Sequence, residues 1–488
     1  MADKTTQFLK GASTQAIITV VMGVMEIVVF AIVSRLLSKT DFGYYAAITG
    51  IIAVVLSISE AGLGSSVIQK KDASTSFIST AFTWSCLIGL TASLAVFIFA
   101  PLLAEIVADQ TLTTPLRIMS ITILFHSIIS VGNGILYKKL AFKTVGVIRA
   151  VSYLIASVAC IIMASLGMGL WAVVALPVIN SIMQVTLTSY FVQWPKLKIE
   201  RSETTEIISF GGWLTLGVIF NNLTQQLDKL LLPKWMSIST LGAYNRPAGF
   251  VSTISDKLNG IFDTVLFPML SDIQDDKARV NNVFKMAVAL LNSFSIILAA
   301  IFFFNAHLII SIFFGENWIE LIPVMQIISI SVIFNVNGRL VDCFFRSLAY
   351  VKLGFFLRVL AAMITFICIY IGSSYGILGV ATAIVIANVT NILVKLSSLA
   401  IKTNTSIFDV CAQMIRAWKP VIPILFIGIP FLLMGSQSLG DSICFALLFF
   451  IIVFVEFTYF PKFVGEVYLS RVYPAVERIK NKVLQTLY

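Results

Sequence analysis

Apolar residues occur along this chain in long continuous runs that are separated by short polar stretches. Each run is about 20 residues long, which is the length of helix that crosses a hydrocarbon core of about 30 Å. The runs lack the alternation of apolar and polar positions that is typical of strands in a membrane barrel. The pattern therefore predicts an all-α integral membrane protein. We expect about 14 transmembrane helices, at residues 11–34, 42–69, 77–100, 116–137, 144–166, 169–193, 207–232, 240–269, 283–305, 319–345, 353–372, 376–399, 420–436 and 441–460.

Ionisable residues lie within several of these apolar runs. Glu26, Glu60, Asp256, Lys257 and Arg339 are each flanked on both sides by apolar turns. A charged side chain at that depth costs at least about 3 kcal/mol unless it faces a cavity or a partner. These positions therefore indicate either a water-filled interior or pairing between helices.

Polar residues also recur at helical spacing in several of the predicted helices. In the helix at 319–345, Asn335, Arg339, Asp342 and Arg346 follow one another at steps that place them on one face. Polar faces in both halves of the chain favour a bundle around a polar cavity, as in a transporter. The alternative is that these groups hold helices together, with Arg339 and Asp342 as a pair within one helix. Hydrogen bonds of that kind are worth about 0.6–2 kcal/mol in a membrane.

The composition agrees with a multispanning membrane protein, because 58% of the 488 residues are hydrophobic and only 12% are charged. The net charge of +10 raises the question of nucleic-acid binding. The basic residues, however, lie mainly in the two tails and in alternate loops. The other set of loops contains only Arg35, Lys39, Arg117 and Lys234. The positive-inside rule then places both termini in the cytoplasm and explains the charge without nucleic acid.

A repeat relates the two halves of the chain. The segment "KTDFGYYAAITG" aligns with "ISTLGAYNRPAG", so that Gly43 corresponds to Gly242 and Tyr45 to Tyr244. Both halves begin on the same side of the membrane, so the repeat is parallel, with its axis along the membrane normal. We expect an N-terminal six-helix lobe at 1–193, a cytoplasmic linker at 194–206, a C-terminal six-helix lobe at 207–402, an amphipathic cytoplasmic helix at 403–419, two additional transmembrane helices at 420–460 and a cytoplasmic tail at 461–488.

The charges within the predicted spans suggest two kinds of site. Arginine and lysine facing a confined space suit a phosphate group. Our candidates for substrate binding are Arg246, Lys257, Arg339, Arg149 and Asn388. Carboxylates within the membrane suit coupling to H+ or Na+. Our candidates for ion coupling are Glu26, Glu60, Asp256 and Asp228. We expect no catalytic residue, no cofactor and no metal, and the six scattered cysteines have no metal-site spacing.

Five segments carry a resemblance to a known family. They are "RLLSKTDFGYY", "EAGLGSSVIQKKD", "LGAYNRPAGF", "TVLFPMLSDIQDD" and "FFGENW". From about Phe8 to Lys402 the chain is similar to the polysaccharide (O-antigen-type) flippases of the multidrug/oligosaccharidyl-lipid/polysaccharide exporter superfamily. The family often has Asp-Leu-Gly where this chain has Glu60, Ala61 and Gly62. This chain keeps the negative charge at that position, but the local geometry can differ from that of the family.

The resemblance implies twelve core helices in two lobes that give alternating access to a central cavity. It implies a polyprenyl-diphosphate-linked oligosaccharide as cargo, moved across the inner membrane of a bacterium, with the diphosphate held by the cations of the cavity. The two additional helices would guide the polyprenyl tail. Expected partners are this cargo, membrane lipids, a polysaccharide polymerase and other assembly proteins, and we expect the flippase itself to be a monomer.

Two other functions stay open at this point. The first is a cation-coupled multidrug exporter of the same superfamily. The second, from another class, is an integral-membrane glycosyltransferase or ligase, and such enzymes usually carry a large extramembrane loop with catalytic residues. The short loops of this chain disfavour an enzyme.

Overall fold

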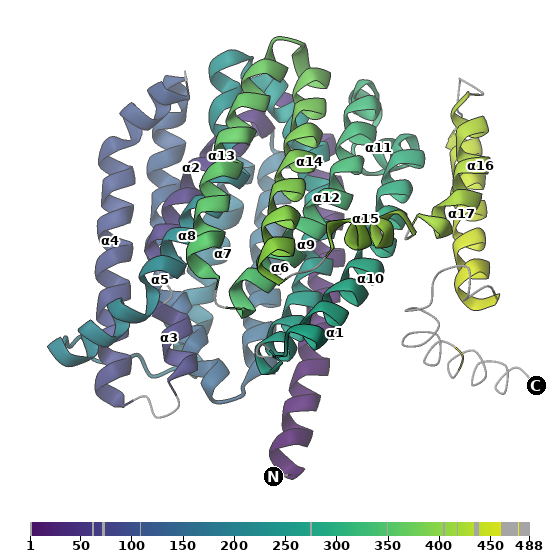
Figure 1. Cartoon of the computed structure of the whole chain (residues 1–488). Coiled ribbons are helices and arrows are strands. Elements are labelled where there is room, and N and C mark those ends of the chain that lie inside the picture. Colours follow the sequence, from purple (N-terminus) through teal and green to yellow (C-terminus); the bar gives the residue numbers. More distant parts are fainter. Residues whose placement is uncertain are drawn as a thin grey trace, which may run out of the picture. The chain divides into compact units, whose positions relative to one another are not determined.

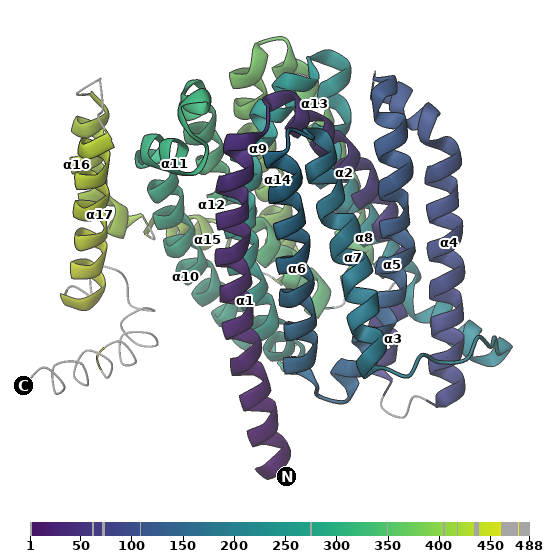
Figure 2. The same cartoon turned by 180° about the vertical axis from the view of Figure 1, so that it is seen from behind.

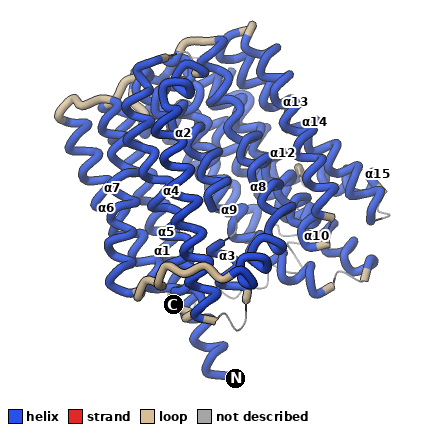
Figure 3. Tube along the Cα trace, turned by 90° about the vertical axis from the view of Figure 1, so that its left-hand side faces the viewer, coloured by secondary structure: helices blue, strands red, loops and turns tan. Residues whose placement is uncertain are grey.

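The computed structural model of this chain describes residues 2–60, 63–70, 74–107, 109–273, 276–348, 350–403, 406–416, 418–433, 439–459 and 477. Within these residues the chain is almost entirely helical and contains no strand (Figure 3). The chain divides into two compact units, Met1–Asn245 and Arg246–Tyr488.

The helices of both units are labelled in Figure 1. The first unit contains α1 (Ala2–Leu36), α2 (Lys39–Glu60), α3 (Leu63–Gln69), α4 (Thr75–Ile106), α5 (Thr113–Lys138), α6 (Phe142–Ser165), α7 (Leu170–Phe191), α8 (Arg201–Trp235) and the start of α9 (Ile238–Asp272). The second unit contains the rest of α9, α10 (Lys277–Phe304), α11 (Ala306–Phe313), α12 (Ile322–Ser347), α13 (Val351–Ser373), α14 (Gly376–Thr403), α15 (Ile407–Arg416), α16 (Ile422–Leu433) and α17 (Leu439–Tyr459).

The long helices coincide with the apolar runs of the sequence. In the described part of the chain, 10 helices are long and apolar enough to cross a membrane. The helices α16 and α17 add shorter apolar stretches, and α8 and α9 are each 35 residues long but richer in polar residues. The chain is therefore an all-α, multi-pass membrane protein, as its hydrophobic pattern predicts.

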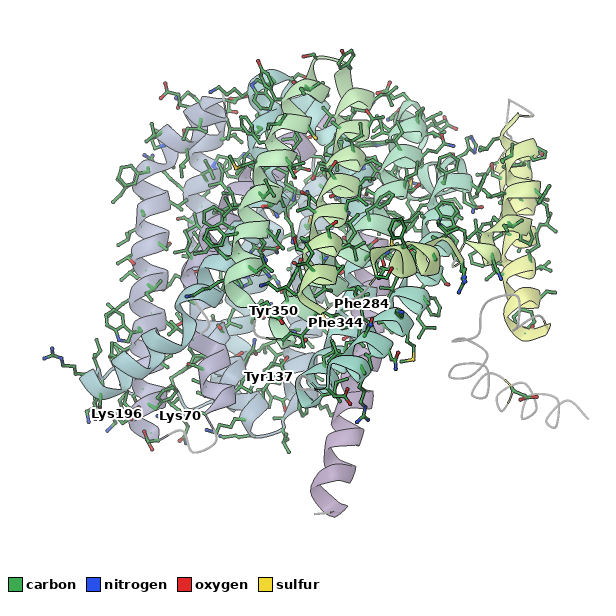
Figure 4. The ribbon with its side chains drawn as sticks, in the orientation of Figure 1. Lys70, Tyr137, Lys196, Phe284, Phe344 and Tyr350 are labelled. Carbon is green, nitrogen blue, oxygen red and sulfur yellow. The ribbon has the colours of Figure 1, made fainter. Side chains whose placement is uncertain are left out.

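The helices differ in how much of their apolar surface the protein covers. In α4, only 17% of the most apolar stretch is buried. In α10, 61% of the corresponding stretch is buried. Phe97, Ile98 and Phe99 of α4 are largely exposed, which suits contact with lipid tails. In the second unit, Phe284 of α10 meets Phe344 of α12 edge to face, with 4.8 Å between ring centroids (Figure 4). In the first unit, α1 lies beside α6 (Figure 2).

The predicted span at 42–69 covers α2 and α3, and residues 61 and 62 between them lie outside the described part of the chain. The helix α2 ends at Glu60 and the short helix α3 begins at Leu63. The second helix packs so closely on α5 that a Cβ atom on Gly64 would lie 2.4 Å from the Ser130 hydroxyl oxygen.

Two glycines allow α2 and α9 to cross at their first turns. A Cβ atom on Gly43 would lie 1.9 Å from the carbonyl oxygen of Ile238, and one on Gly242 would lie 1.8 Å from that of Lys39. Neither position has room for a side chain, so the crossing requires glycine on both helices. These are the two glycines that the sequence repeat aligns, and both lie within the first compact unit.

The segment before α8 is fixed to the end of the first unit. It runs extended along α4, where the Lys198 amide donates to Thr83 Oγ1 at 2.9 Å and the Glu200 amide donates to Thr80 Oγ1 at 3.2 Å. Glu203, in the first turn of α8, forms an ion pair with Lys70 at 3.1 Å. Figure 4 shows Lys70 at the same end of the unit as Lys196 of this extended segment.

Candidate functional site

Two ion pairs connect α12 to different neighbours in the second unit. Arg339 Nη2 of α12 lies 2.5 Å from Asp256 Oδ1 of α9. Lys395 Nζ of α14 donates to Asp342 Oδ2 of α12 at 2.8 Å. The polar face predicted for this helix therefore carries a cation and a carboxylate, each paired with a different helix.

The predicted alternative of a pair between Arg339 and Asp342 is wrong. These residues share a face of α12, as their spacing requires, but each forms its ion pair with a residue of another helix. The carboxylate of Asp342 accepts from Lys395, while the guanidinium of Arg339 reaches Asp256. Spacing along one helix fixes which side chains share a face, but it contains no information about partners on adjacent helices.

The two pairs differ sharply in exposure. The side chains of Arg339 and Asp256 are 38% and 48% exposed, whereas those of Lys395 and Asp342 are 13% and 14% exposed. An exposed pair contributes about 0–1 kcal/mol, so its members exchange partners at little cost. Breaking a buried pair costs about 3–5 kcal/mol because it leaves an uncompensated charge. We therefore take Arg339 and Asp256 as the candidate site and Lys395 with Asp342 as its structural support.

The other candidates for substrate binding lie at several places. Arg246 is half-buried on α9, and Asn388 is half-buried on α14, both in the second unit. The side chain of Lys257 lies outside the described residues. Arg149 is in α6 of the first unit, where it is close enough to His126 for their charges to interact. The described side chains thus bring together Arg339 and Asp256, while the remaining assignments stay predictions.

Two of the candidate carboxylates have tyrosine neighbours in the first unit. The Tyr244 hydroxyl hydrogen-bonds to Asp228, which also accepts from the Lys229 amide at 2.9 Å. Glu26 of α1 interacts electrostatically with Tyr153 of α6. Neither tyrosine was predicted from the sequence to be a partner of these carboxylates. The fourth candidate, Glu60, has a side chain outside the described residues.

A buried amide pair joins α10 and α12 and was not predicted from the sequence. Asn337 Nδ2 of α12 donates to Asn292 Oδ1 of α10 at 2.9 Å. Asn292 Nδ2 in turn donates to the carbonyl oxygen of Met414 in α15 at 2.8 Å. Both asparagines are buried, with exposures of 0% for Asn292 and 2% for Asn337. A lone asparagine within the apolar run of α10 was the available signal, because a buried amide needs partners.

The carboxylate at Asp109 lies between two spans and has a defined environment. It accepts from the Tyr44 hydroxyl at 2.7 Å and from the Thr111 amide at 2.9 Å. Partial burial acts to raise the pKa of Asp109, but these hydrogen bonds outweigh burial and hold the pKa below its ordinary value. Its contacts fix the loop between α4 and α5, so we assign it a structural role.

Comparison with known proteins identifies the family. Residues 32–323 match the family described as polysaccharide biosynthesis protein. The lipopolysaccharide biosynthesis protein WzxC of Escherichia coli (strain K12) is 25% identical over 397 residues, which cover 79% of this chain and 80% of that protein. The teichuronic acid biosynthesis protein TuaB of Bacillus subtilis (strain 168) is 24% identical over 356 residues, which cover 69% of this chain and 71% of that protein.

The fold is similar to that of a solved membrane protein. The structure described as lipid II flippase MurJ, inward closed conformation, superposes with a TM-score of 0.70 at 15% identity. The match covers 91% of this chain and 98% of the flippase. Together with the match over residues 32–323, this likeness confirms the resemblance carried by the sequence motifs, and the chain belongs to the polysaccharide biosynthesis protein family.

Proposed function

We propose that this protein is a flippase that moves a polyprenyl-diphosphate-linked oligosaccharide across the bacterial inner membrane by alternating access. The family, the named roles of the relatives in polysaccharide assembly and the flippase-like fold support this function over an enzymatic one. The observation on which the mechanism rests is the exposed ion pair of Arg339 and Asp256.

Arg339 binds the diphosphate in this mechanism. A guanidinium forms two parallel hydrogen bonds to phosphate oxygens, and such charge-assisted bonds are about twice as strong as neutral ones. The guanidinium of Arg339 is paired with Asp256, so the diphosphate must displace this carboxylate. The displaced carboxylate is a group that can take up a proton, which links cargo binding to the coupling ion.

The proton therefore acts as a competitor of the ion pair. When Asp256 is protonated it no longer attracts Arg339, and the guanidinium is available to the phosphate. When the proton leaves, Asp256 competes for Arg339 again and favours release of the cargo. The largely buried pair of Lys395 and Asp342 keeps α12 and α14 together while the more exposed pair exchanges.

The remaining parts of the proposal concern orientation and partners. Both termini and the segment before α8 face the cytoplasm, in agreement with the distribution of basic residues. The apolar helices α16 and α17 guide the polyprenyl tail. The protein works as a monomer that delivers its cargo to a polysaccharide polymerase and other assembly proteins.

Binding of undecaprenyl diphosphate to the purified full-length chain tests this function. We expect Arg339→Gln to weaken binding about tenfold or more, since a hydrogen bond to a charged group contributes about 1.5–3 kcal/mol. We expect Asp256→Asn to strengthen binding about two- to fivefold, because it removes a competitor worth up to about 1 kcal/mol. Asp342→Asn is the matched control, a carboxylate of α12 that does not pair with Arg339.

The directions in which Arg339→Gln and Asp256→Asn change lipid binding distinguish a binding site from a structural pair. If Arg339→Gln and Asp256→Asn weaken binding to the same extent, the pair is structural and the mechanism is wrong. If the wild-type chain does not bind the lipid and instead exports ethidium from vesicles, the protein is a multidrug exporter. Thermal unfolding of each variant identifies loss of folded protein.

A further inference from the structure

The short helix α15 lies between the apolar helices α14 and α16 in the chain. It runs across the direction of α12 and α14 (Figure 1). One side of it is held by α10. Val410 is only 2% exposed, and the carbonyl oxygen of Met414 accepts from the fully buried Asn292. The helix α15 is thus fixed to α10 by a defined contact.

The opposite side of α15 is apolar and uncovered by the described residues. Phe408 is 83% exposed and Ile415 is 70% exposed, and seven residues place them two turns apart on one face. Trp418 lies three residues after Ile415 and is 42% exposed. Large apolar groups in contact with water forgo about 1.5–3 kcal/mol each, so this face favours an apolar environment.

Positive charge borders this apolar face. Arg416 and Lys419 are exposed beside Trp418, and Lys402 is exposed at the end of α14. The sequence between Lys402 and Lys419 contains one acidic residue, Asp409. Apolar and aromatic side chains bordered by cations match the boundary between acyl chains and anionic headgroups.

The attachment point of α15 has a suitable depth. Asn292 follows Lys285, the last charged residue of α10, by seven residues, which is about 10 Å along a helix. Interfacial helices place their apolar face about 5–10 Å into the headgroup boundary. Lys285 can reach the headgroup region from such a position because long basic side chains extend toward water.

We propose that α15 and the turn after it form a binding surface for anionic phospholipids of the cytoplasmic leaflet. The apolar face formed by Phe408 and Ile415 inserts among the acyl chains, and Arg416 and Lys419 bind the headgroups. The buried asparagines transmit the position of α15 to α12, where Asn337 precedes Arg339 by two residues. This last step rests on the proposed function, whereas lipid binding does not.

Quenching of Trp418 fluorescence by brominated lipids tests the surface. The full-length chain is placed in nanodiscs containing brominated phosphatidylglycerol or brominated phosphatidylcholine at equal mole fractions. The signal of Trp418 is the difference between the wild-type chain and Trp418→Phe. We expect phosphatidylglycerol to quench Trp418 at a lower mole fraction than phosphatidylcholine, with a preference that weakens as salt is added.

The variant Arg416→Gln/Lys419→Gln identifies the groups responsible. We expect the mole fraction of phosphatidylglycerol that gives half-maximal quenching to rise about fivefold per cation removed, the equivalent of about 1 kcal/mol each. The matched control is Lys139→Gln/Lys196→Gln, which removes two exposed cations of other predicted cytoplasmic loops. This control should keep the wild-type preference.

Two results would overturn the proposal. Equal quenching by the two lipids in the wild-type chain would mean contact with the bilayer without recognition of anions. Absence of quenching by both lipids would mean that α15 faces water or protein. Neither measurement involves the cargo, so either result would leave the proposed flippase function intact.

Discussion

Exposure decides the roles of the two ion pairs on α12. Both pairs join a basic and an acidic side chain across helices, at distances of 2.5 and 2.8 Å. Arg339 and Asp256 are partly exposed, whereas the protein largely encloses Lys395 and Asp342. An attraction that is weak when cargo is absent permits exchange with a phosphate group. A desolvated attraction between two helices maintains their packing instead.

The first prediction compares the stability of variants at these pairs. We expect Lys395→Met to lower the free energy of unfolding by about 3–5 kcal/mol, because Asp342 then remains largely buried without its cation. Arg339→Met should lower it by at most about 1 kcal/mol. Chemical unfolding of the purified chain in detergent measures both values. Similar losses for the two variants would contradict the assignment, and recovery in Lys395→Met/Asp342→Leu would support the desolvation argument.

The second prediction concerns the buried amide that holds α15. Asn292→Leu removes the donor to the Met414 carbonyl, and an unpaired buried acceptor costs about 1–3 kcal/mol. We expect faster amide hydrogen exchange throughout residues 407–416 in this variant. Asn337→Leu is the control, because it leaves the bond from Asn292 to Met414 in place. Equal acceleration by both variants would mean that general loosening of α10 and α12, rather than this bond, controls the helix.

At the scale of elements, hydrophobic periodicity predicted the positions of the helices but not their partners. The spans at 77–100 and 144–166 correspond closely to α4 and α6, because a bilayer imposes the length of an apolar helix. The spacing of Arg339 and Asp342 correctly predicted a shared face. Their partners come from α9 and α14, and sequence spacing within one helix does not specify which neighbour packs against it.

The crossing of α2 and α9 at their glycines is a second contact that the sequence alone did not predict. The repeat aligned Gly43 with Gly242, yet nothing in the alignment indicated that the two helices touch at these positions. Contact between the backbones of α2 and α9 depends on the path of both chains, with a Cβ atom of Gly242 falling 2.6 Å from the Gly43 amide nitrogen. Small residues at such crossings let helices approach closely in membranes.

The third prediction tests this crossing. We expect Gly242→Ala to destabilise the protein and to reduce the yield of folded chain, because the backbones must separate to admit a methyl group. Gly249→Ala is the matched control in the same helix, where no atom lies within 4 Å of the added Cβ. The control should stabilise α9 by up to about 1 kcal/mol, since alanine favours helices over glycine. Thermal unfolding measures both, and equal behaviour would contradict the close approach.

At the scale of the whole molecule, orientation in the membrane depends on the loops rather than on any single helix. Each apolar helix could insert in either direction, and the basic residues of the short loops bias the choice. The segment before α8 illustrates this, because Lys196 and Lys198 lie in a stretch that is hydrogen-bonded to the N-terminal part of α4. Lys70 lies at the same end of the unit and pairs with Glu203 (Figure 4).

The fourth prediction concerns this orientation. Single cysteines replacing Lys196 and Tyr375 are placed in a chain from which the six native cysteines have been removed. Both positions are exposed, and an odd number of predicted spans separates them, so they should face opposite sides of the membrane. We expect a membrane-impermeant maleimide added to intact cells to label Tyr375→Cys, and to label Lys196→Cys only after the membrane is opened. Labelling of both from one side would contradict the predicted topology, because the cytoplasmic placement of the segment before α8 and the count of crossings between the two positions could not then both hold.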